Sequence, residues 1–277
     1  MTLYETITAA VRDLTSYGYD SPARLEYWLG ELRKAAVASM WSPVKAREEL
    51  HRSLVTLYDR LVIKGGVAKF HVGVPRYTID RLTPLMRQEL DRRILASADL
   101  IKLNRDEAVE KTLRRFSGWA TSIPAGGSRV VDKPEVKDDV AKALRSLPYR
   151  ERVVLIDQGH KLIASINMVV AKGGGAIAAE WHSHFRQRGY DYREDHKERD
   201  GKVYLIRGNW AQEKGLVKPG KAGYLDEITQ VGEEPMCRCF NSFVYAPSRL
   251  PIEMLTQKGI DALDEIKRNQ HGRTLAA

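Results

Sequence analysis

The chain has 277 residues, of which 43% are hydrophobic, and a formal net charge of +9 at pH 7. This length and composition suffice for a sizeable core, which excludes an intrinsically disordered protein and leaves room for one large or two ordinary domains. The sequence has no uninterrupted run of about eighteen apolar residues, and its N-terminus lacks a basic segment followed by an apolar one, so we expect a soluble, unexported protein.

The charge and the cysteines narrow the expected partners and compartment. Residues 1–120 hold 20 Lys and Arg against 15 Asp and Glu, and the rest holds 25 against 21, so neither part is a concentrated basic module. The net charge still suggests an anionic partner, either double-stranded DNA or an acidic protein surface. The only cysteines, Cys237 and Cys239, would close a very small, strained disulfide ring, which favours a reducing compartment.

The first 120 residues are predicted to form a helical bundle. Ser or Thr followed by Pro marks a helix start, because the hydroxyl caps the helix and proline fits its first turn. Three such pairs occur, at Ser21-Pro22, Ser42-Pro43 and Thr83-Pro84. Apolar residues at helical spacing follow them, and the last segment predicts two helices, over 83–101 and 104–116.

The middle of the chain predicts connectors and two further helices. Residues 68–74 alternate as a short strand or extended connector, in which we expect His71 to be structural. Residues 121–137 are rich in types that helices avoid and are predicted to be a linker. Helices are expected over 136–144 and 150–170, and the three glycines that follow indicate a turn, since no Gly-Lys-Ser/Thr comes after them.

The last hundred residues mix strand and helix. Residues 176–184 fit a strand or a helix, and 202–206 and 240–245 are predicted strands. Residues 207–234 are polar and glycine-dotted, too long for a simple hairpin, and are interpreted as a functional or clamp loop. Residues 256–269 predict an amphipathic helix that could dock on a partner.

The predicted fold class is therefore α+β, with an N-terminal helical bundle followed by a smaller mixed α/β domain that contains a short antiparallel sheet. The expected boundaries are 1–120 for the bundle, 121–137 for the linker, 138–250 for the mixed domain and 251–277 for a C-terminal helical tail.

The candidate site residues lie in one stretch near the C-terminal third of the chain. Cys and His are the side chains that most readily bind a metal or do chemistry, and here they flank a loop. The candidates are Asp191, Arg193, His196, Asp200, Gly201, Pro235, Cys237, Arg238 and Cys239.

The order of these residues resembles the signature of the phage Mu F-like minor head proteins, a family required for head morphogenesis in tailed double-stranded DNA bacteriophages. The resemblance covers roughly residues 140–246. Its parts are an apolar helix over 150–170, glycines before Trp181, an Arg-x-x-His step from Arg193 to His196, the turn Asp200-Gly201, and Pro-x-Cys-Arg-Cys from Pro235 to Cys239. The chain departs from the pattern in its long loop over 207–234 and in Gly159-His160, where many relatives carry a Thr-Glu pair.

The resemblance implies a minor capsid or head morphogenesis protein in the phage head, and in the host cytoplasm during assembly. It implies binding to the portal protein or the major capsid protein at the inner capsid surface, and contact with packaged double-stranded DNA, during head assembly or genome ejection. In that picture the helical faces and the C-terminal helix contact proteins, and we expect Arg92, Arg93, Arg114 and Arg115 to contact phosphates. No enzymatic activity and no required cofactor are expected.

Three interpretations of the Cys and His residues stay open. His196, Cys237 and Cys239 could hold a structural zinc, with His182 or His184 as the fourth ligand. Alternatively, two buried cysteines lie on the core face of a strand with Arg238 outward, and a polar brace is formed by His196, Arg193, Asp191 and Asp200. This packing interpretation is the favoured one.

The third interpretation is catalysis. His196 followed by Asn209 has a faint likeness to a metal-dependent nuclease of the His-Asn-His type, and Cys237 with His196 could form a nucleophile and base. The nuclease pattern requires another His shortly after the Asn, and the next one is His271. A metal-dependent nuclease or a DNA-binding protein associated with phage DNA is thus the alternative function.

Overall fold

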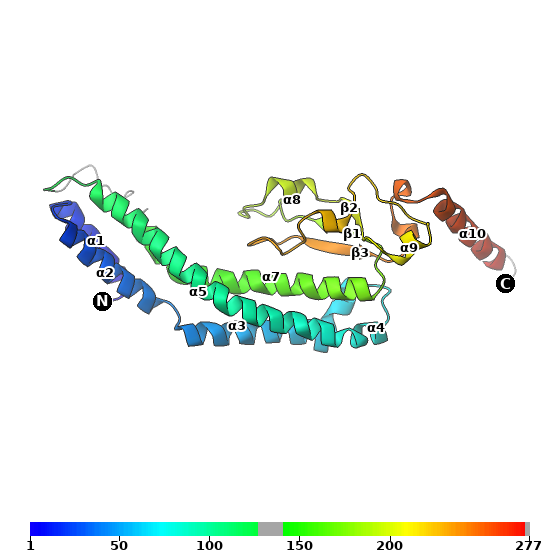
Figure 1. Ribbon diagram of the computed structural model, residues 1–277, viewed down its shortest axis with the longest axis horizontal. Coiled ribbons are helices and arrows are strands. Elements are labelled where there is room, and N and C mark those ends of the chain that lie inside the picture. The colour runs from blue at the N-terminus through cyan, green and yellow to red at the C-terminus, as the bar shows by residue number, and fades with distance from the viewer. Residues whose placement is uncertain (127–140, 275–277) are drawn as a thin grey trace. The chain divides into compact units, whose positions relative to one another are not determined.

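The computed structural model describes residues 1–126 and 141–274 (Figure 1). These residues are mostly helical, with one small antiparallel sheet that follows the N-terminal helices. The predicted α+β fold class is confirmed.

The chain divides into two compact units, each made of two segments. The first contains Met1–Ser53 and Ile94–Ile156, and the second contains Leu54–Arg93 and Asp157–Ala277. Both units therefore take residues from the predicted 1–120 bundle, because long helices pass from one unit into the other. Residues 127–140 lie outside the described part of the chain. They include most of the expected linker over 121–137 and the first part of the expected helix over 136–144.

The first unit is built from helices. They are α1 (Leu3–Tyr17), α2 (Pro22–Ser39), the first part of α3 (Pro43–Tyr58), the second part of α5 (Thr83–Thr121) and the start of α7 (Leu147–Gly173). Leu14, Leu32, Phe116 and Leu144 are fully buried in its apolar core. Burial of such side chains from several helices is what holds a helical unit together, since isolated helices are marginal in water.

The helix starts predicted at Ser21 and Ser42 are confirmed by their caps. The Ser21 hydroxyl accepts a hydrogen bond from the backbone N–H of Arg24 at 3.4 Å, and the Ser42 hydroxyl accepts one from Lys45 at 3.2 Å. The predicted break between residues 101 and 104 is wrong, because α5 is one helix of 39 residues. No Pro or Gly lies between Pro84 and Gly118, so nothing in this stretch interrupts the helix.

The second unit combines helices with the sheet. The expected strand or connector at 68–74 is instead a 3-10 helix followed by a turn. The helical elements besides the parts of α3, α5 and α7 are a π-helical turn (Asp59–Ile63), a 3-10 helix (Gly66–Phe70), α4 (Arg76–Arg81), α8 (Glu194–Glu198), α9 (Trp210–Glu213), 3-10 turns at Leu225–Glu227, Pro247–Arg249 and Ile252–Met254, and α10 (Gln257–Thr274).

The sheet has three antiparallel strands in the order β2-β1-β3. Strand β1 (Ala178–His182) is central, and Ala178 is opposite Leu205 of β2 (Val203–Leu205) and Val244 of β3 (Phe240–Val244). Both expected strands at 202–206 and 240–245 are confirmed, and residues 176–184 contain a strand rather than a helix. Strands β2 and β3 pair with opposite edges of β1, so the loop over residues 207–234 connects the two edge strands.

Helix α7 contributes to the core beside the sheet. Its residues Ala164, Met168 and Ala171 belong to the same apolar cluster as Trp181 and Tyr204. Residues 153–173 are long and apolar enough to cross a membrane, but a core helix of a soluble protein meets the same test. The apolar run therefore has a packing role in this fold and carries no information on location.

His71 is structural, as expected from the sequence. It is almost fully buried, with Nδ1 at 2.5 Å from the hydroxyl of Tyr245 and Nε2 at 3.1 Å from Oδ1 of Asn167. Its ring stacks on Phe243 at 5.4 Å between centroids. Burial lowers the pKa of His71, so the neutral form connects α7 to the end of β3.

Candidate functional site

The segment from Pro235 to Cys239 makes a tight turn immediately before β3. The backbone N–H of Cys237 donates to the carbonyl of Glu234 at 3.2 Å, which places Pro235 second and Met236 third in a four-residue turn. Met236 has φ +61°, so proline followed by a left-handed residue gives the arrangement of a type II turn. Methionine is an unfavourable residue there, since its Cβ crowds the backbone in that region.

Three side chains hold this turn by its backbone. Arg193 Nη2 donates to the carbonyl of Pro235 at 2.9 Å, and Oδ1 of Asp157 accepts from the N–H of Met236 at 2.6 Å. The hydroxyl of Tyr190 donates to the carbonyl of Met236 and accepts from the N–H of Arg238, both at 3.2 Å. These bonds satisfy backbone groups that the turn does not pair in the sheet, which makes the loop a rigid platform for the cysteines.

His196 is brought to this platform by the short helix α8. Its side chain is 2% exposed, and its ring meets Trp181 of β1 edge to face at 5.3 Å. The guanidinium of Arg199, one turn further along, lies 5.1 Å from the ring centroid of Trp181. Packing against the indole therefore orients the imidazole.

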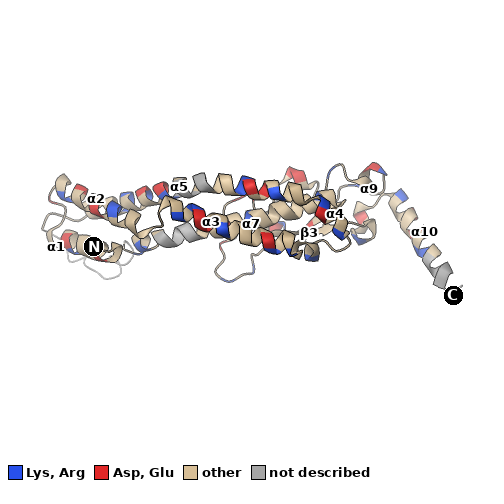
Figure 2. Cartoon of the chain, turned by 90° about the horizontal axis from the view of Figure 1, so that it is seen from below, with Lys and Arg blue, Asp and Glu red and all other residues tan. Residues whose placement is uncertain are grey.

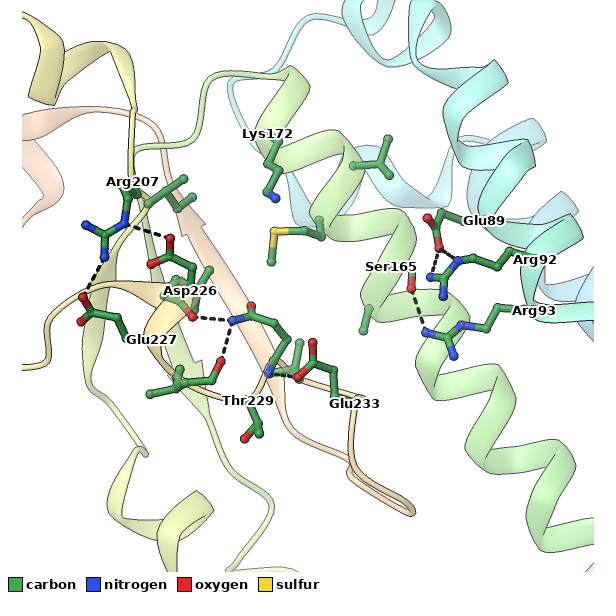
Figure 3. A pocket seen from close by; sticks show the side chains of 18 residues that line it. Glu89, Arg92, Arg93, Ser165, Lys172, Arg207, Asp226, Glu227, Thr229 and Glu233 are labelled. Atoms are coloured by element: carbon green, nitrogen blue, oxygen red, sulfur yellow. Dashed lines mark hydrogen bonds and ion pairs between the residues drawn. The ribbon is translucent and has the colours of Figure 1, made fainter. Parts of the chain in front are cut away.

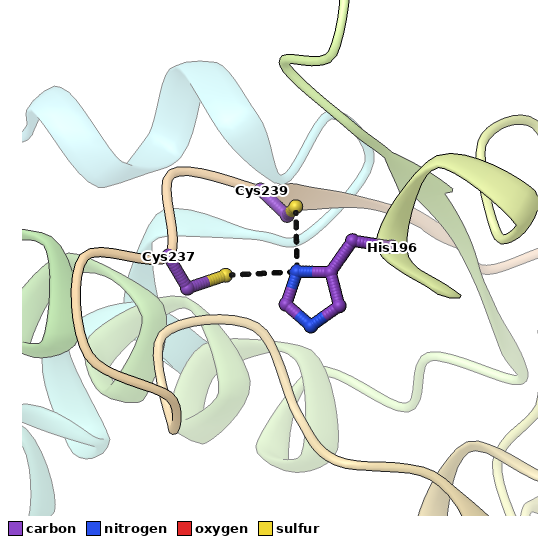
Figure 4. Close-up of side chains that lie close together, drawn as sticks. All are labelled: His196, Cys237 and Cys239. Atoms are coloured by element: carbon purple, nitrogen blue, oxygen red, sulfur yellow. Dashed lines mark hydrogen bonds between the residues drawn. The ribbon is translucent and has the colours of Figure 1, made fainter. Parts of the chain in front are cut away.

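The two thiols and the imidazole converge on one point (Figure 4). Sγ of Cys237 lies 3.7 Å and Sγ of Cys239 lies 3.5 Å from the same atom, Nδ1 of His196. The three possible ligand atoms all lie within 4.8 Å of one another, and all three residues are buried. The three residues that the sequence singles out as possible metal ligands thus lie together.

The opposite ring nitrogen of His196 faces carboxylates. Nε2 lies 3.7 Å from Oε2 of Glu234 and 3.9 Å from Oδ2 of Asp195. It is buried and has no hydrogen-bond partner among the described residues. Glu234 is itself held by an ion pair with Arg193, so one carboxylate is fixed beside the ring.

The thiols titrate as a pair. The hydrogen bond from the Cys239 thiol lowers the pKa of Cys237 to about 5, although burial opposes this. The same hydrogen bond, with burial, raises the pKa of Cys239 above its ordinary value. Of the two coupled thiols, Cys237 is therefore the more acidic.

The remaining members of the predicted polar brace lie elsewhere. Oδ1 of Asp200 accepts from the backbone N–H of Ser183 at 2.7 Å, and Gly201, at φ +74°, donates its N–H to the carbonyl of Trp181 at 2.8 Å. These two residues thus form the turn that leads from α8 into β2. Asp191 is exposed, so the brace is made by Arg193 with Asp157 and Glu234 instead.

The histidines expected as a fourth metal ligand are not part of this group. The rings of His182 and His184 lie 4.7 and 5.9 Å from the ring of Phe240, and neither belongs to the group of converging ligand atoms. Arg238 was expected to face outward, yet it is half-buried and lines a cavity of about 180 Å³ beside His160. The cysteines precede β3 and do not lie in it, because the turn at Met236 occupies those positions.

The most important residue that the sequence did not indicate is Asp157. It lies in the apolar helix α7 and pairs with Lys161 at 3.2 Å, and both side chains are almost fully buried. A lone acidic residue within an apolar run was an available signal, since such a charge is kept only when it has partners. Tyr190 had no comparable signal, because its role depends on a turn 46 residues further along the chain.

The arginines expected to contact phosphates fall into two groups. Arg92 and Arg93 line a cavity of about 840 Å³ in the second unit, where Arg92 pairs with Glu89 and Arg93 donates to Oγ of Ser165 at 3.3 Å (Figure 3). The lining holds four basic and four acidic side chains, so their formal charges cancel.

Arg114 and Arg115 are exposed on the part of α5 that belongs to the first unit. Basic and acidic residues alternate along the helices (Figure 2). The four arginines are thus divided between the two units.

Asn209, the residue that suggested a nuclease, is engaged in local structure. Its Oδ1 accepts from the backbone N–H groups of Ala211 and Gln212, both at 3.0 Å, and its Nδ2 donates to the carbonyl of Ile206 at 2.6 Å. It is a helix cap for α9.

Comparison of the whole chain with protein-family models, curated proteins and solved structures finds no match.

Proposed function

We propose that this protein is a minor capsid or head morphogenesis protein of a tailed double-stranded DNA bacteriophage, which acts by binding the portal protein or the inner capsid surface. One observation carries the proposal. The Arg-x-x-His step and the Pro-x-Cys-Arg-Cys segment, about forty residues apart, meet through the hydrogen bond from Arg193 to Pro235 and the contacts of His196 with both cysteines. Residues that resemble a family signature in sequence thus also work as one structural unit.

The hydrogen bonds and burial of these groups favour a binding protein over an enzyme. Arg193, Asp157 and Tyr190 are bonded to the backbone of the turn, and the sulfur atoms are buried beneath it. A site of this kind stabilises the shape of a small domain. A contact surface for a partner then lies outside it, and α10 offers one, since Ile260 and Leu263 pack on the second unit while Ile266 is exposed.

The test is co-expression of the full chain with the portal and major capsid proteins encoded by the same genome. Recovery of a tagged chain with portal rings or assembled heads supports the proposal, and an Ile266→Glu variant that folds but is recovered less would place the contact on α10. Heads that assemble and fill with DNA equally well without this gene, together with no binding to either protein, would overturn it.

The same purified protein also tests the alternative function. Cleavage of plasmid DNA that requires a divalent metal and is lost in His196→Ala would assign a nuclease. Affinity for DNA that falls steeply with salt, without affinity for either head protein, would assign a DNA-binding protein.

A further inference from the structure

We propose that Nδ1 of His196 and the sulfur atoms of Cys237 and Cys239 bind a zinc ion. The inference is independent of the proposed role in a phage head, because it depends only on the geometry of these three residues.

The two sulfur–nitrogen distances fit a zinc tetrahedron. Zinc lies about 2.3 Å from thiolate sulfur and about 2.0–2.1 Å from imidazole nitrogen, so tetrahedral angles place sulfur and nitrogen about 3.6 Å apart. The observed separations from Nδ1 are 3.7 Å for Cys237 and 3.5 Å for Cys239. Both sulfur–nitrogen separations therefore match those of two thiolates and an imidazole that share one zinc ion.

Hydrogen bonding alone does not use this arrangement well. Nδ1 of an imidazole carries either one lone pair or one proton, so it makes one good hydrogen bond in the ring plane. Two sulfur atoms nevertheless point at it from separate positions in the turn (Figure 4). A cation resolves the conflict, because two thiolates and a neutral imidazole can all be its ligands at once.

The far side of the imidazole is arranged as it is in metal sites. When Nδ1 binds a metal, Nε2 carries the proton, and metal-bound histidines usually donate that proton to a carboxylate, carbonyl or water. Here Nε2 is buried and unpaired among the described residues, with the Glu234 carboxylate 3.7 Å away. Arg193 holds Glu234 in place through an ion pair. A small movement of Glu234 completes the hydrogen bond.

The chain also prepares the site before a metal arrives. The turn that carries Cys237 and Cys239 has its backbone bonded to Arg193, Asp157 and Tyr190. It includes the strained φ of Met236, which persists only where the surroundings impose it. Fixed ligands reduce the conformational entropy lost on binding, and hence favour affinity.

The ligand set selects the metal. Two thiolates and one imidazole suit zinc, whereas magnesium and calcium prefer oxygen ligands. The group formed by Asp195, His196 and Glu234 offers such oxygens through the other face of the ring, but the Asp195 side chain is 51% exposed.

The experiment uses the reduced full-length chain, stripped of metal by a chelator and then titrated with Zn²⁺ and with Co²⁺. We expect about one ion per chain, tetrahedral d–d bands with cobalt, and sulfur-to-cobalt charge-transfer absorption. Zinc bound to the wild type should show, by X-ray absorption, two sulfur neighbours at about 2.3 Å and nitrogen or oxygen neighbours at about 2.0–2.1 Å. That measurement requires no variant, so it stands even if a ligand substitution prevents folding.

Variants then separate the ligands from their neighbours. Cys237→Ser, Cys239→Ser and His196→Gln should each remove the sulfur–cobalt signal or weaken it severely. Glu234→Gln should lower affinity about 10–100-fold, as for other carboxylates that orient a metal-bound histidine. His184→Gln is the matched control, a nearby histidine outside the cluster, and should bind zinc like the wild type.

Two results would overturn the proposal. One is a folded wild-type chain that binds no zinc at micromolar concentration under reducing conditions. The other is a bound ion without sulfur neighbours whose affinity depends on Asp195, as shown by Asp195→Asn, since that would assign the site to the carboxylates.

Discussion

The turn that carries the cysteines should depend on one buried carboxylate in α7. Asp157 accepts from the N–H of Met236 at 2.6 Å and pairs with Lys161 at 3.2 Å, while Gln158 donates to its second oxygen at 3.2 Å. The side chains of Asp157 and Lys161 are 10% and 11% exposed. Asp157→Ala would leave a buried ammonium and a backbone N–H without their partner.

Breaking a buried ion pair by removal of one member costs about 3–5 kcal/mol, because the other charge stays buried. We expect Asp157→Ala to lower the free energy of unfolding by this amount. Asp157→Asn keeps Oδ1 as an acceptor for Met236 and removes only the charge. The difference between the two variants should be about 1–3 kcal/mol, the cost of the unsatisfied N–H.

The measurement is urea unfolding of the full chain, followed by tryptophan fluorescence and circular dichroism to test whether the transition is two-state. Asp91→Asn is the control, since Asp91 forms an exposed i,i+4 pair with Arg87 and should change stability by less than about 0.5 kcal/mol. A loss below about 1 kcal/mol for Asp157→Ala, or equal losses for Ala and Asn, would refute this account of the turn.

Three further predictions test other parts of the fold. Burial lowers the pKa of His71 below its ordinary 6.5, so as pH falls the unfolded chain binds the proton before the folded chain does, and the free energy of unfolding should fall below about pH 6.5. His71→Gln should flatten this dependence of stability on pH in denaturation series, and an unchanged dependence would contradict the prediction. Met236→Gly should raise the free energy of unfolding slightly, by up to about 1 kcal/mol, because glycine relieves the strain at φ +61°. Thermal unfolding checks this, and a clear loss of stability would show that the side chain matters more. Gly259→Ala should destabilise the docking of α10, because the new Cβ would lie 2.1 Å from the carbonyl oxygen of Leu216. Gly118→Ala has open space around the new Cβ and should stabilise the protein by about 0.5–1 kcal/mol. Hydrogen exchange in α10 and thermal unfolding measure both effects, and the prediction fails if the two variants behave alike.

Local signals in the sequence were sufficient for much of the secondary structure. Ser21 and Ser42 marked helix starts because a cap is made with a backbone N–H three residues away, so both partners are neighbours in the chain. The turn pair Asp200-Gly201 marked β2, alternation marked β3, and the apolar run marked α7, because turn chemistry and side-chain periodicity are local properties of the chain. The α+β class followed from these elements.

The sequence also determined which residues could form a site. His196, Cys237 and Cys239 were candidates by side-chain chemistry alone, and the resemblance to a family signature placed them in one group. Side-chain chemistry alone left three interpretations open, however. The same Cys and His side chains can bind a metal, pack in a core or catalyse a reaction, and only the positions of their atoms distinguish these roles.

Only the tertiary structure decided how these atoms meet. Nδ1 of His196 faces both sulfur atoms, His182 and His184 turn to Phe240, and Asp157 reaches Met236 across 79 residues. Such contacts depend on how separate segments pack, which no local pattern specifies. The same reason explains why β1 became the central strand: its partners come from either side of a long loop, and packing against α7 selects the pairing that buries Trp181.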